Sequence, residues 1–453
     1  MKNCLTYFLL FLIISLNGCK SAVTDKNSGI EGWKISGEYY YVDNKLGNDN
    51  NPGTKRLPLK SISEVNLRIQ NKPASVYFAS GQIFNGTLNL KGVIGSESNL
   101  INITSYGKGR AKIYGANTEA VKIEDCNFIK ISELMIEGSG RKGGNTTNGI
   151  SLIRTTNSRV ENIDTEGFQK SGLDLLDCSG VEVKNVYAFN NGFCGINIMG
   201  SDQKFSRNIL IHFCRAENNP GDPTILDNHS GNGILVGVSD SVVVDHCTAT
   251  NNGWDMPREG NGPVGIWTWE SNNVIIQHCI SYRNKTSKNG KDGGGFDLDG
   301  GVTNSIIQYC LSYENEGAGY GLFQYSGASD WSDNIIRNCV SINDGLKTDG
   351  SGSFFLWNGS GEDKQLANCE IFNNLVYSDS IPVVSFENAS AHKNFTFHDN
   401  IFIGSGQLIS GHNSGSVFYS NIWWGMREPV KHTDLQILKL NRLFKTIIDI
   451  QIP

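Results

Sequence analysis

Apolar residues alternate with other residues in short stretches that recur along most of the chain. The opening stretches are GISLI at 149, GLDLL at 172, GINIM at 195, GILVG at 233, GIWTW at 265, GFDLD at 295, GYGLF at 319 and SFFLW at 353. Side chains of a strand point alternately to its two faces, so this pattern indicates strands with one face in a core. The chain is therefore predicted to be built mainly from short strands.

A second landmark follows each opening stretch and shows that the strands belong to a repeat. It is formed by Ile163, Val186, Cys214, Cys247, Cys279, Cys310 and Cys339, with Cys369 and Asn400 continuing the column. These cysteines are the first residues of the pattern C-x-x-x-x-N. The shortest repeat unit, from Gly149 to Gly172, is 23 residues long. Strands and turns at so short a period are typical of a parallel β-solenoid, in which stacked coils share one core.

With this repeat, the chain resembles the right-handed parallel β-helix superfamily of pectate lyases and polygalacturonases. The resemblance covers about residues 38–425 and implies an all-β, right-handed parallel β-helix. It implies no single activity, because one fold hosts many functions. The N-terminal segment "YYVDNKLGNDNNPGTKRLPLKSISEVN" also resembles the first segment of secreted β-helix proteins. It predicts a short capping helix from Ser61, with Glu64 at capping-box spacing, over the open end of the solenoid.

The two ends of the chain differ from the repeat. Residues 1–18 contain Lys2 and the apolar run "YFLLFLIISL", followed by "NGC" ending at Cys19. This resembles a bacterial lipoprotein signal and implies lipid on Cys19, residues 19–37 as a tether, and a lipid-anchored protein of the cell envelope. An ordinary signal peptide is the alternative. Residues 426–453 break the repeat and are predicted to be a cap or an irregular tail.

Composition and cysteine placement exclude several function classes. The formal net charge is −6, and there is no basic stripe, which argues against a nucleic-acid partner. No C-x-x-C motif or zinc-type His/Cys spacing occurs. The cysteines that share one column of the repeat, Cys369 included, are predicted to be reduced thiols packed inside the solenoid. We expect a monomer without a metal or other cofactor.

The stretch "DGGGFDLDGG" carries the strongest candidate for a site. Phe296 and Leu298 continue the inward columns of the repeat, so Asp297 and Asp299 are expected on the outward face. Aligning the coils places aromatic residues beside them that are expected to bind sugar rings, with the first two as exposed tryptophans: Trp267, Trp269, Phe323 and Trp357. Exposed aromatic rings around two acids predict a carbohydrate groove on this face.

Long loops enter the same face and are expected to wall the groove. They carry His229 and Lys291, which we assign to substrate binding, while the short loop "ENEGA" leaves an opening above the acids. Asp297 and Asp299 are the predicted catalytic pair, and Glu316 could replace either one. Residues i and i+2 of a strand have Cα atoms about 6.6 Å apart, nearer to the carboxyl spacing of inverting than of retaining glycosidases.

Three functions fit these residues. The first is a glycoside hydrolase that uses the two aspartates on a polysaccharide or oligosaccharide. The second is a polysaccharide lyase acting on uronic acids, with Arg258, Lys288 or Lys291 as base and calcium on the aspartates. The coils of this chain resemble those of family-9 pectate lyases. However, the segment "ENEGAGYG" stands where those lyases carry an acidic calcium-binding cluster, which weakens this alternative. The third is a glycan-binding lipoprotein without catalysis.

Overall fold

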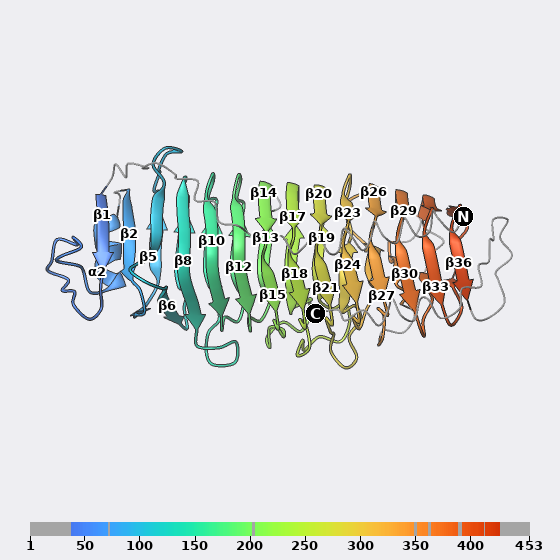
Figure 1. Ribbon diagram of the computed structural model, residues 1–453, viewed down its shortest axis with the longest axis horizontal. Coiled ribbons are helices and arrows are strands. Elements are labelled where there is room, and N and C mark those ends of the chain that lie inside the picture. The colour runs from blue at the N-terminus through green and yellow to red at the C-terminus, as the bar shows by residue number, and fades with distance from the viewer. Residues whose placement is uncertain are drawn as a thin grey trace. The chain divides into compact units, whose positions relative to one another are not determined.

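A computed structural model describes residues 38–70, 73–201, 204–347, 351–360, 364–387, 392–411 and 413–425 of the chain. Within these residues one helix and many parallel strands make up the regular structure, so the protein is all-β as predicted. The strands stack coil upon coil from β1 (Glu38–Val42) to β36 (Ile422–Gly425), as Figure 1 shows. No helix of the described residues is long and apolar enough to span a membrane.

One face of the solenoid is a 12-stranded parallel sheet that contains the predicted opening strands. Its members are β4 (Leu88–Lys91), β7 (Val121–Glu124), β9 (Ile150–Ile153), β11 (Ser171–Leu176), β13 (Cys194–Met199), β16 (Asn232–Gly237), β19 (Val264–Trp269), β22 (Gly294–Leu298), β25 (Tyr320–Gln324), β28 (Phe354–Asn358), β31 (Val384–Glu387) and β34 (Ile409–Gly411). We call it the site sheet, because it positions the functional side chains described below.

The remaining strands form a 24-stranded sheet that wraps the other sides of each coil. Its first strands are β1, β2 (Ala74–Ala79), β3 (Ile83–Asn85), β5 (Ile101–Tyr106), β6 (Ala111–Ala116), β8 (Ile129–Gly138), β10 (Arg159–Glu166) and β12 (Glu182–Phe189). After β12 each coil contributes two strands separated by a corner. The first column is β14 (Ser206–His212), β17 (Ser239–Asp245), β20 (Asn272–Gln277), β23 (Ile306–Gln308), β26 (Trp331–Arg337), β29 (Leu366–Phe372), β32 (His392–His398) and β35 (Ser416–Tyr419). The second is β15 (Arg215–Glu217), β18 (Thr248–Thr250), β21 (Ile280–Tyr282), β24 (Leu311–Tyr313), β27 (Val340–Ile342), β30 (Leu375–Ser378), β33 (Ile401–Gly404) and β36.

The predicted capping helix is present as α2 (Ile62–Ile69), at the blue end of the stack in Figure 1. Ser61 is its N-cap, and the Ser61 hydroxyl accepts a hydrogen bond from the backbone N–H of Glu64. The apolar face of the helix, with Ile62 and Val65, is buried against the first coil. This arrangement covers apolar surface that the end of a solenoid otherwise exposes to water.

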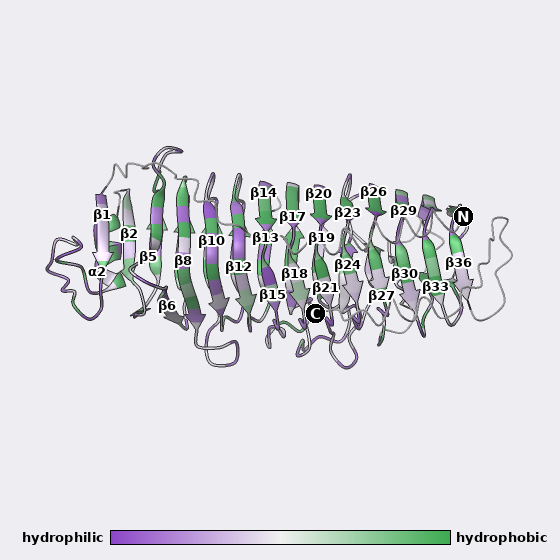
Figure 2. Ribbon diagram, viewed as in Figure 1, coloured by the Kyte–Doolittle hydropathy of each residue, from purple (hydrophilic) through white to green (hydrophobic). Residues whose placement is uncertain are grey.

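Alternating side chains fill the interior, as the repeat predicts. Figure 2 shows hydrophobic and hydrophilic residues alternating along strands such as β8, β10 and β12. In the site sheet, one inward column runs through Ile266, Phe296, Tyr320 and Phe354, which pair in register from coil to coil. Each of these side chains is at most 1% exposed, so the coils share one continuous apolar core.

The cysteine column is confirmed for five of its six predicted members. Cys214, Cys247, Cys279, Cys310 and Cys339 lie at the corner between the two columns of the large sheet, and every cysteine in the described part of the chain is buried and unpaired. Cys369 is also a buried free thiol, but its predicted place in the column is wrong, because it pairs with Asn334 and Phe395 inside strands. The coil after Cys339 is longer than the preceding ones, so that Asn374 takes the corner position above Cys339.

A buried ladder of asparagines runs beside the cysteines. It consists of Asn191, Asn219, Asn252, Asn284 and Asn315, and ends at Asp344. Each side-chain oxygen accepts hydrogen bonds from the backbone N–H and the amide of the preceding member, as Asn284 does from Asn252. The ladder satisfies backbone groups that a buried turn would leave without partners. It explains the final asparagine of the C-x-x-x-x-N pattern.

Candidate functional site

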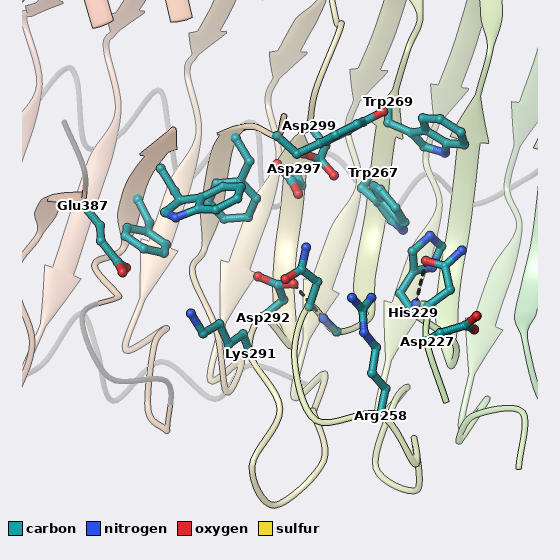
Figure 3. Close-up of a pocket in the computed structure, with 17 residues that line it drawn as sticks. Asp227, His229, Arg258, Trp267, Trp269, Lys291, Asp292, Asp297, Asp299 and Glu387 are labelled. Carbon is teal, nitrogen blue, oxygen red and sulfur yellow. Dashed lines mark hydrogen bonds between the residues drawn. The ribbon is translucent and has the colours of Figure 1, made fainter. Parts of the chain in front are cut away.

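A pocket of about 380 Å³ opens on the site sheet, where strands from several coils meet the long loops (Figure 3). Its lining residues are Asp227, Asn228, His229, Arg258, Asn261, Gly262, Trp267, Trp269, Lys291, Asp292, Asp297, Asp299, Phe323, Tyr325, Phe355, Trp357 and Glu387. The pocket thus joins the predicted aspartates, the predicted aromatic residues and two loop residues, His229 and Lys291. Segments far apart in the sequence form it because the coils stack in register.

The strand register places the aspartates where the alternation predicts them. Asp297 on β22 pairs with Trp267 on β19 and with Gly321 on β25. A side chain at position 321 would begin only 2.7 Å from the Phe323 ring and 2.9 Å from the Asp297 carboxylate, so this glycine allows the Phe323 ring to pack close to Asp297. Asp299 follows β22 on the same face, and Figure 3 shows both carboxylates beside the two tryptophans and above the loop residues.

Asp297 is an unusual carboxyl group for an outward-facing residue. Its side chain is only 2% exposed, and its Oδ1 atom has no hydrogen-bond partner within the protein. Burial, followed by the charges of Asp299 and Asp292, raises the pKa of Asp297 well above its usual value. This setting favours the protonated form of the carboxyl group, which can donate its proton.

Asp299 and Asp292 surround Asp297 with two further carboxyl groups. Burial raises the pKa of Asp299 to about 7, although its Oδ1 accepts a hydrogen bond from the Gly300 N–H at 2.7 Å. Burial also raises the pKa of Asp292 to about 6, against the opposing effect of the Gly262 N–H, which donates to Asp292 Oδ2 at 2.7 Å. The three groups therefore differ in their hydrogen-bond partners and charged neighbours, which allows them to divide the roles of acid and base.

The prediction of two exposed tryptophans is wrong for Trp267. Its side chain is 4% exposed, its Nε1–H donates to Asn232 Oδ1 at 3.1 Å, and the His229 ring packs edge-on against it at 4.8 Å. Loop residues cover this indole, which makes it a wall of the pocket instead of an open platform. Trp269 is partly exposed and lies over Gly237, whose missing side chain leaves room for the indole.

The opposite wall is also aromatic. Phe323 packs edge-on against Phe355 and Trp357, with ring centroids 5.5 and 6.4 Å apart. Phe323 is 8% exposed, and Trp357 keeps part of its surface open to the pocket. Carboxyl groups between two apolar walls lose hydration, which is the physical cause of their raised pKa values.

The loops bring the predicted His229 and Lys291 to the pocket, together with Arg258. Burial and the nearby Arg258 charge lower the pKa of His229 to about 4, so this imidazole is neutral at physiological pH. His229 Nδ1 lies 3.0 Å from the Asn232 side-chain amide, which donates to it and leaves the proton on Nε2. A neutral His229 can donate one hydrogen bond to a ligand hydroxyl but carries no charge for an anion.

Glu316 does not join the aspartates. Its carboxylate accepts a hydrogen bond from the Thr286 N–H at 2.9 Å and pairs with Lys347 Nζ at 2.9 Å. It lines a separate hollow with residues such as Arg283 and Leu346. Glu316 is therefore not a substitute for either aspartate, because Lys347 holds its side chain away from the pocket.

Several lining residues were not assigned to the site from the sequence. Asp292 lies in one of the long loops that lead to the outward face of the site sheet. The turn signal "KDGG" gave no sign that its carboxyl group would enter the pocket. Tyr325, Phe355, Asp227 and Glu387 were also missed. Phe355 was the easiest to find, because it shares a column with Trp267 and Asp297 in the aligned coils.

Metal-ligating groups converge elsewhere in the described residues. One trio of such side chains, Asp245, His246 and His278, has its ligand atoms within 4.8 Å of one another. It lies on the large sheet and not in the pocket. The calcium ion of the lyase alternative stays a prediction.

Comparison with known proteins agrees with the architecture. A family model described as "Right handed beta helix region" matches residues 222–402. The chain folds as a right-handed β-helix. This β-helix has no match among curated proteins.

Solved structures share the β-helix at low sequence identity. The GH136 lacto-N-biosidase from Eubacterium ramulus superposes with a TM-score of 0.59 at 18% identity, covering 80% of this chain and 67% of that chain. The catalytic domain of a GH87 alpha-1,3-glucanase in complex with nigerose gives 0.56 at 13% identity, with 86% and 69% covered. The Dettilon tailspike protein gives 0.51 at 13% identity, with 82% and 68% covered. These identities establish a common fold and nothing finer.

Proposed function

We propose that this β-helix is a carbohydrate-active enzyme, a glycoside hydrolase that cleaves a polysaccharide or oligosaccharide in the pocket of the site sheet. The observation that carries the proposal is the buried Asp297 carboxyl, with an unbonded oxygen, beside Asp299 and Asp292. Aromatic walls on both sides provide apolar surfaces of the kind that pack against sugar rings. The similar solved structures include a lacto-N-biosidase and an alpha-1,3-glucanase, which supports a glycan substrate.

The raised pKa values support a division of roles between the aspartates. Asp297, whose pKa is raised well above its usual value and whose Oδ1 has no hydrogen-bond partner, donates its proton to the glycosidic oxygen as general acid. Asp299, whose ionised form is favoured by the hydrogen bond from the Gly300 N–H, activates the attacking water. The neutral His229 and the partly exposed Trp269 and Trp357 hold the sugar rings.

A panel of plant and algal polysaccharides tests the proposal. Wild-type protein and the variant Asp297→Asn are incubated with each glycan, and both new reducing ends and the ultraviolet absorbance of unsaturated products are measured. A hydrolase releases reducing ends without that absorbance, and the variant loses the release. Unsaturated products would show a lyase instead, and a glycan that binds without being cleaved would show a binding protein.

The lyase alternative has one observation in its favour. Arg258 and Lys291 both line the pocket, so a cationic base and a partner for a uronate carboxylate are at hand. The pocket also holds Asp227, Asp292, Asp297, Asp299 and Glu387. Asp297 favours its neutral, protonated form, but the other carboxyl groups offset the charges of the two cations, which disfavours an anionic sugar and favours a neutral glycan.

Asp292→Asn is expected to move the pH profile of kcat/KM to lower pH. The charge of Asp292 raises the pKa of both Asp297 and Asp299, so its removal lowers both values. The acidic limb reports ionisation of the base and the alkaline limb reports deprotonation of the acid. Both limbs should therefore shift to lower pH. Asp227 is an exposed residue at the rim of the pocket, so Asp227→Asn should leave both limbs in place. An unmoved alkaline limb in Asp292→Asn would contradict the assigned roles.

We also propose that the protein is anchored in the bacterial envelope through lipid on Cys19. The support is the sequence "SLNGC", which lies outside the described residues. Cys19→Ala should block lipidation and leave an unprocessed precursor or a soluble form, detected by fractionation and mass spectrometry. A processed Cys19→Ala protein that still partitions with membranes would exclude the lipid anchor.

A further inference from the structure

A corner of the large sheet carries two imidazoles and a carboxylate that face one another. Asp245 ends β17, His246 follows it at the corner, and His278 occupies the same corner one coil further on. Asp245 Oδ2 lies 2.9 Å from His246 Nδ1, and Asp245 Oδ1 lies 2.9 Å from His278 Nδ1. We propose that these three side chains bind a divalent transition-metal ion such as Zn²⁺.

The coil repeat holds the two imidazoles in place. Each histidine precedes a buried member of the cysteine column, Cys247 or Cys279, so the backbone at the corner is anchored in the core. The two rings stack with centroids 4.7 Å apart. Phe213 and Tyr309 continue the stack on either side, each 5.2 Å from the nearest imidazole. This four-ring stack reduces the side-chain freedom that metal binding would otherwise have to remove.

The donor set suits the proposed ion. Two imidazole nitrogens and one carboxylate oxygen are ligands that Zn²⁺ takes, with a fourth position open to water. A tetrahedral zinc site separates neighbouring ligand atoms by about 3.3 Å. The two 2.9 Å contacts, which involve different oxygens of Asp245, need to lengthen slightly, and the three ligand atoms, all within 4.8 Å of one another, need to converge on one ion.

Metal binding also requires the protons on the Nδ1 atoms to move. A carboxylate only accepts hydrogen bonds, so each imidazole donates to Asp245 from its Nδ1–H. When the metal takes that nitrogen, the proton goes to Nε2 if Nε2 is unprotonated, and otherwise to water.

The trio is accessible from solvent. The side chains of His246 and His278 are 37% and 41% exposed, and that of Asp245 is 22% exposed. A metal ion can therefore enter without any opening of the fold. The bound ion would join the coil of Asp245 and His246 to the next coil, independently of the glycan pocket on the site sheet.

A second histidine in the same setting provides a matched control. His398 Nδ1 lies 2.8 Å from Asp399 Oδ2, and its ring stacks between Phe372 and Tyr419 at 4.8 and 5.0 Å. His398 has no second imidazole beside it, because the rings on either side are the phenyl group of Phe372 and the phenol of Tyr419. One imidazole and one carboxylate make a much weaker zinc site than two imidazoles and a carboxylate.

Isothermal titration calorimetry of the full chain with ZnCl₂ tests the proposal. Wild-type protein should show saturable binding, and zinc should raise its Tm. His246→Gln, His278→Gln and Asp245→Asn should each weaken that binding at least about tenfold, whereas His398→Gln should bind as the wild type does. All four side chains are at least partly exposed, and Tm values without zinc verify folding. Wild-type protein without saturable binding, or trio variants that bind as tightly, would overturn the site.

Discussion

Asp297→Asn is expected to lower turnover of the cleaved glycan at least about 100-fold, the usual contribution of a positioned general acid. Asparagine has nearly the shape of a protonated aspartic acid but cannot give up a proton to the glycosidic oxygen. KM should change little, because the walls that hold the sugar are untouched. Asp299→Asn should lower turnover to a similar extent, since it removes the base. Initial rates by reducing-end assay measure both effects.

Folding of Asp297→Asn should not suffer. The folded-state pKa of Asp297 is raised, so the native protein loses stability as the pH rises from the ordinary aspartate value toward that raised value. A neutral asparagine removes this loss, and the Tm at neutral pH should equal or exceed that of the wild type. A loss of activity with an unchanged Tm therefore assigns the effect to chemistry.

Asp174→Asn is the matched control for the catalytic variant. Asp174 lies on β11 in the same outward column, its pKa is also raised by burial, to about 6, and its Oδ1 accepts a hydrogen bond from Asn197. It does not line the pocket. Turnover should stay at the wild-type level in Asp174→Asn. Near-full activity in Asp297→Asn and Asp299→Asn would show that the pair is buried surface without a catalytic role.

The second large effect is expected on stability. Asn284→Ala removes an oxygen that accepts hydrogen bonds from the buried Asn252 backbone N–H at 3.3 Å and from its side-chain amide at 2.9 Å. It also removes the side-chain amide that donates hydrogen bonds to Asn315 Oδ1 and Ser281 Oγ. Each buried group left without a partner costs about 1–3 kcal/mol, so the free energy of unfolding should fall by about 3 kcal/mol or more. Urea unfolding followed by circular dichroism measures the change.

Asn289→Ala separates the ladder from a general effect of losing an asparagine. Asn289 lies on an exposed loop and donates one hydrogen bond to Glu259 at 3.0 Å. Its replacement should change the free energy of unfolding by no more than about 0.5 kcal/mol. Equal losses for the two variants would mean that the ladder contributes no special stability.

Alternation along the chain was enough to predict the solenoid and the face of each strand residue. Phe296 faces inward and Asp297 outward because a strand has only two faces and the core takes the apolar one. The same reasoning placed Trp267 below Asp297, since stacked coils repeat the same face in register. These features depend on local geometry, which neighbouring residues determine.

Only the tertiary structure decided what surrounds those residues. Coverage by the loops, through groups such as His229, turns Trp267 into a buried wall and raises the pKa of Asp297. A cation from another loop, Lys347, draws Glu316 away from the pocket. The position of Cys369 depends on a loop length that shifts its register. Loop paths follow from contacts between residues distant in sequence, and the strand period carries no information about them.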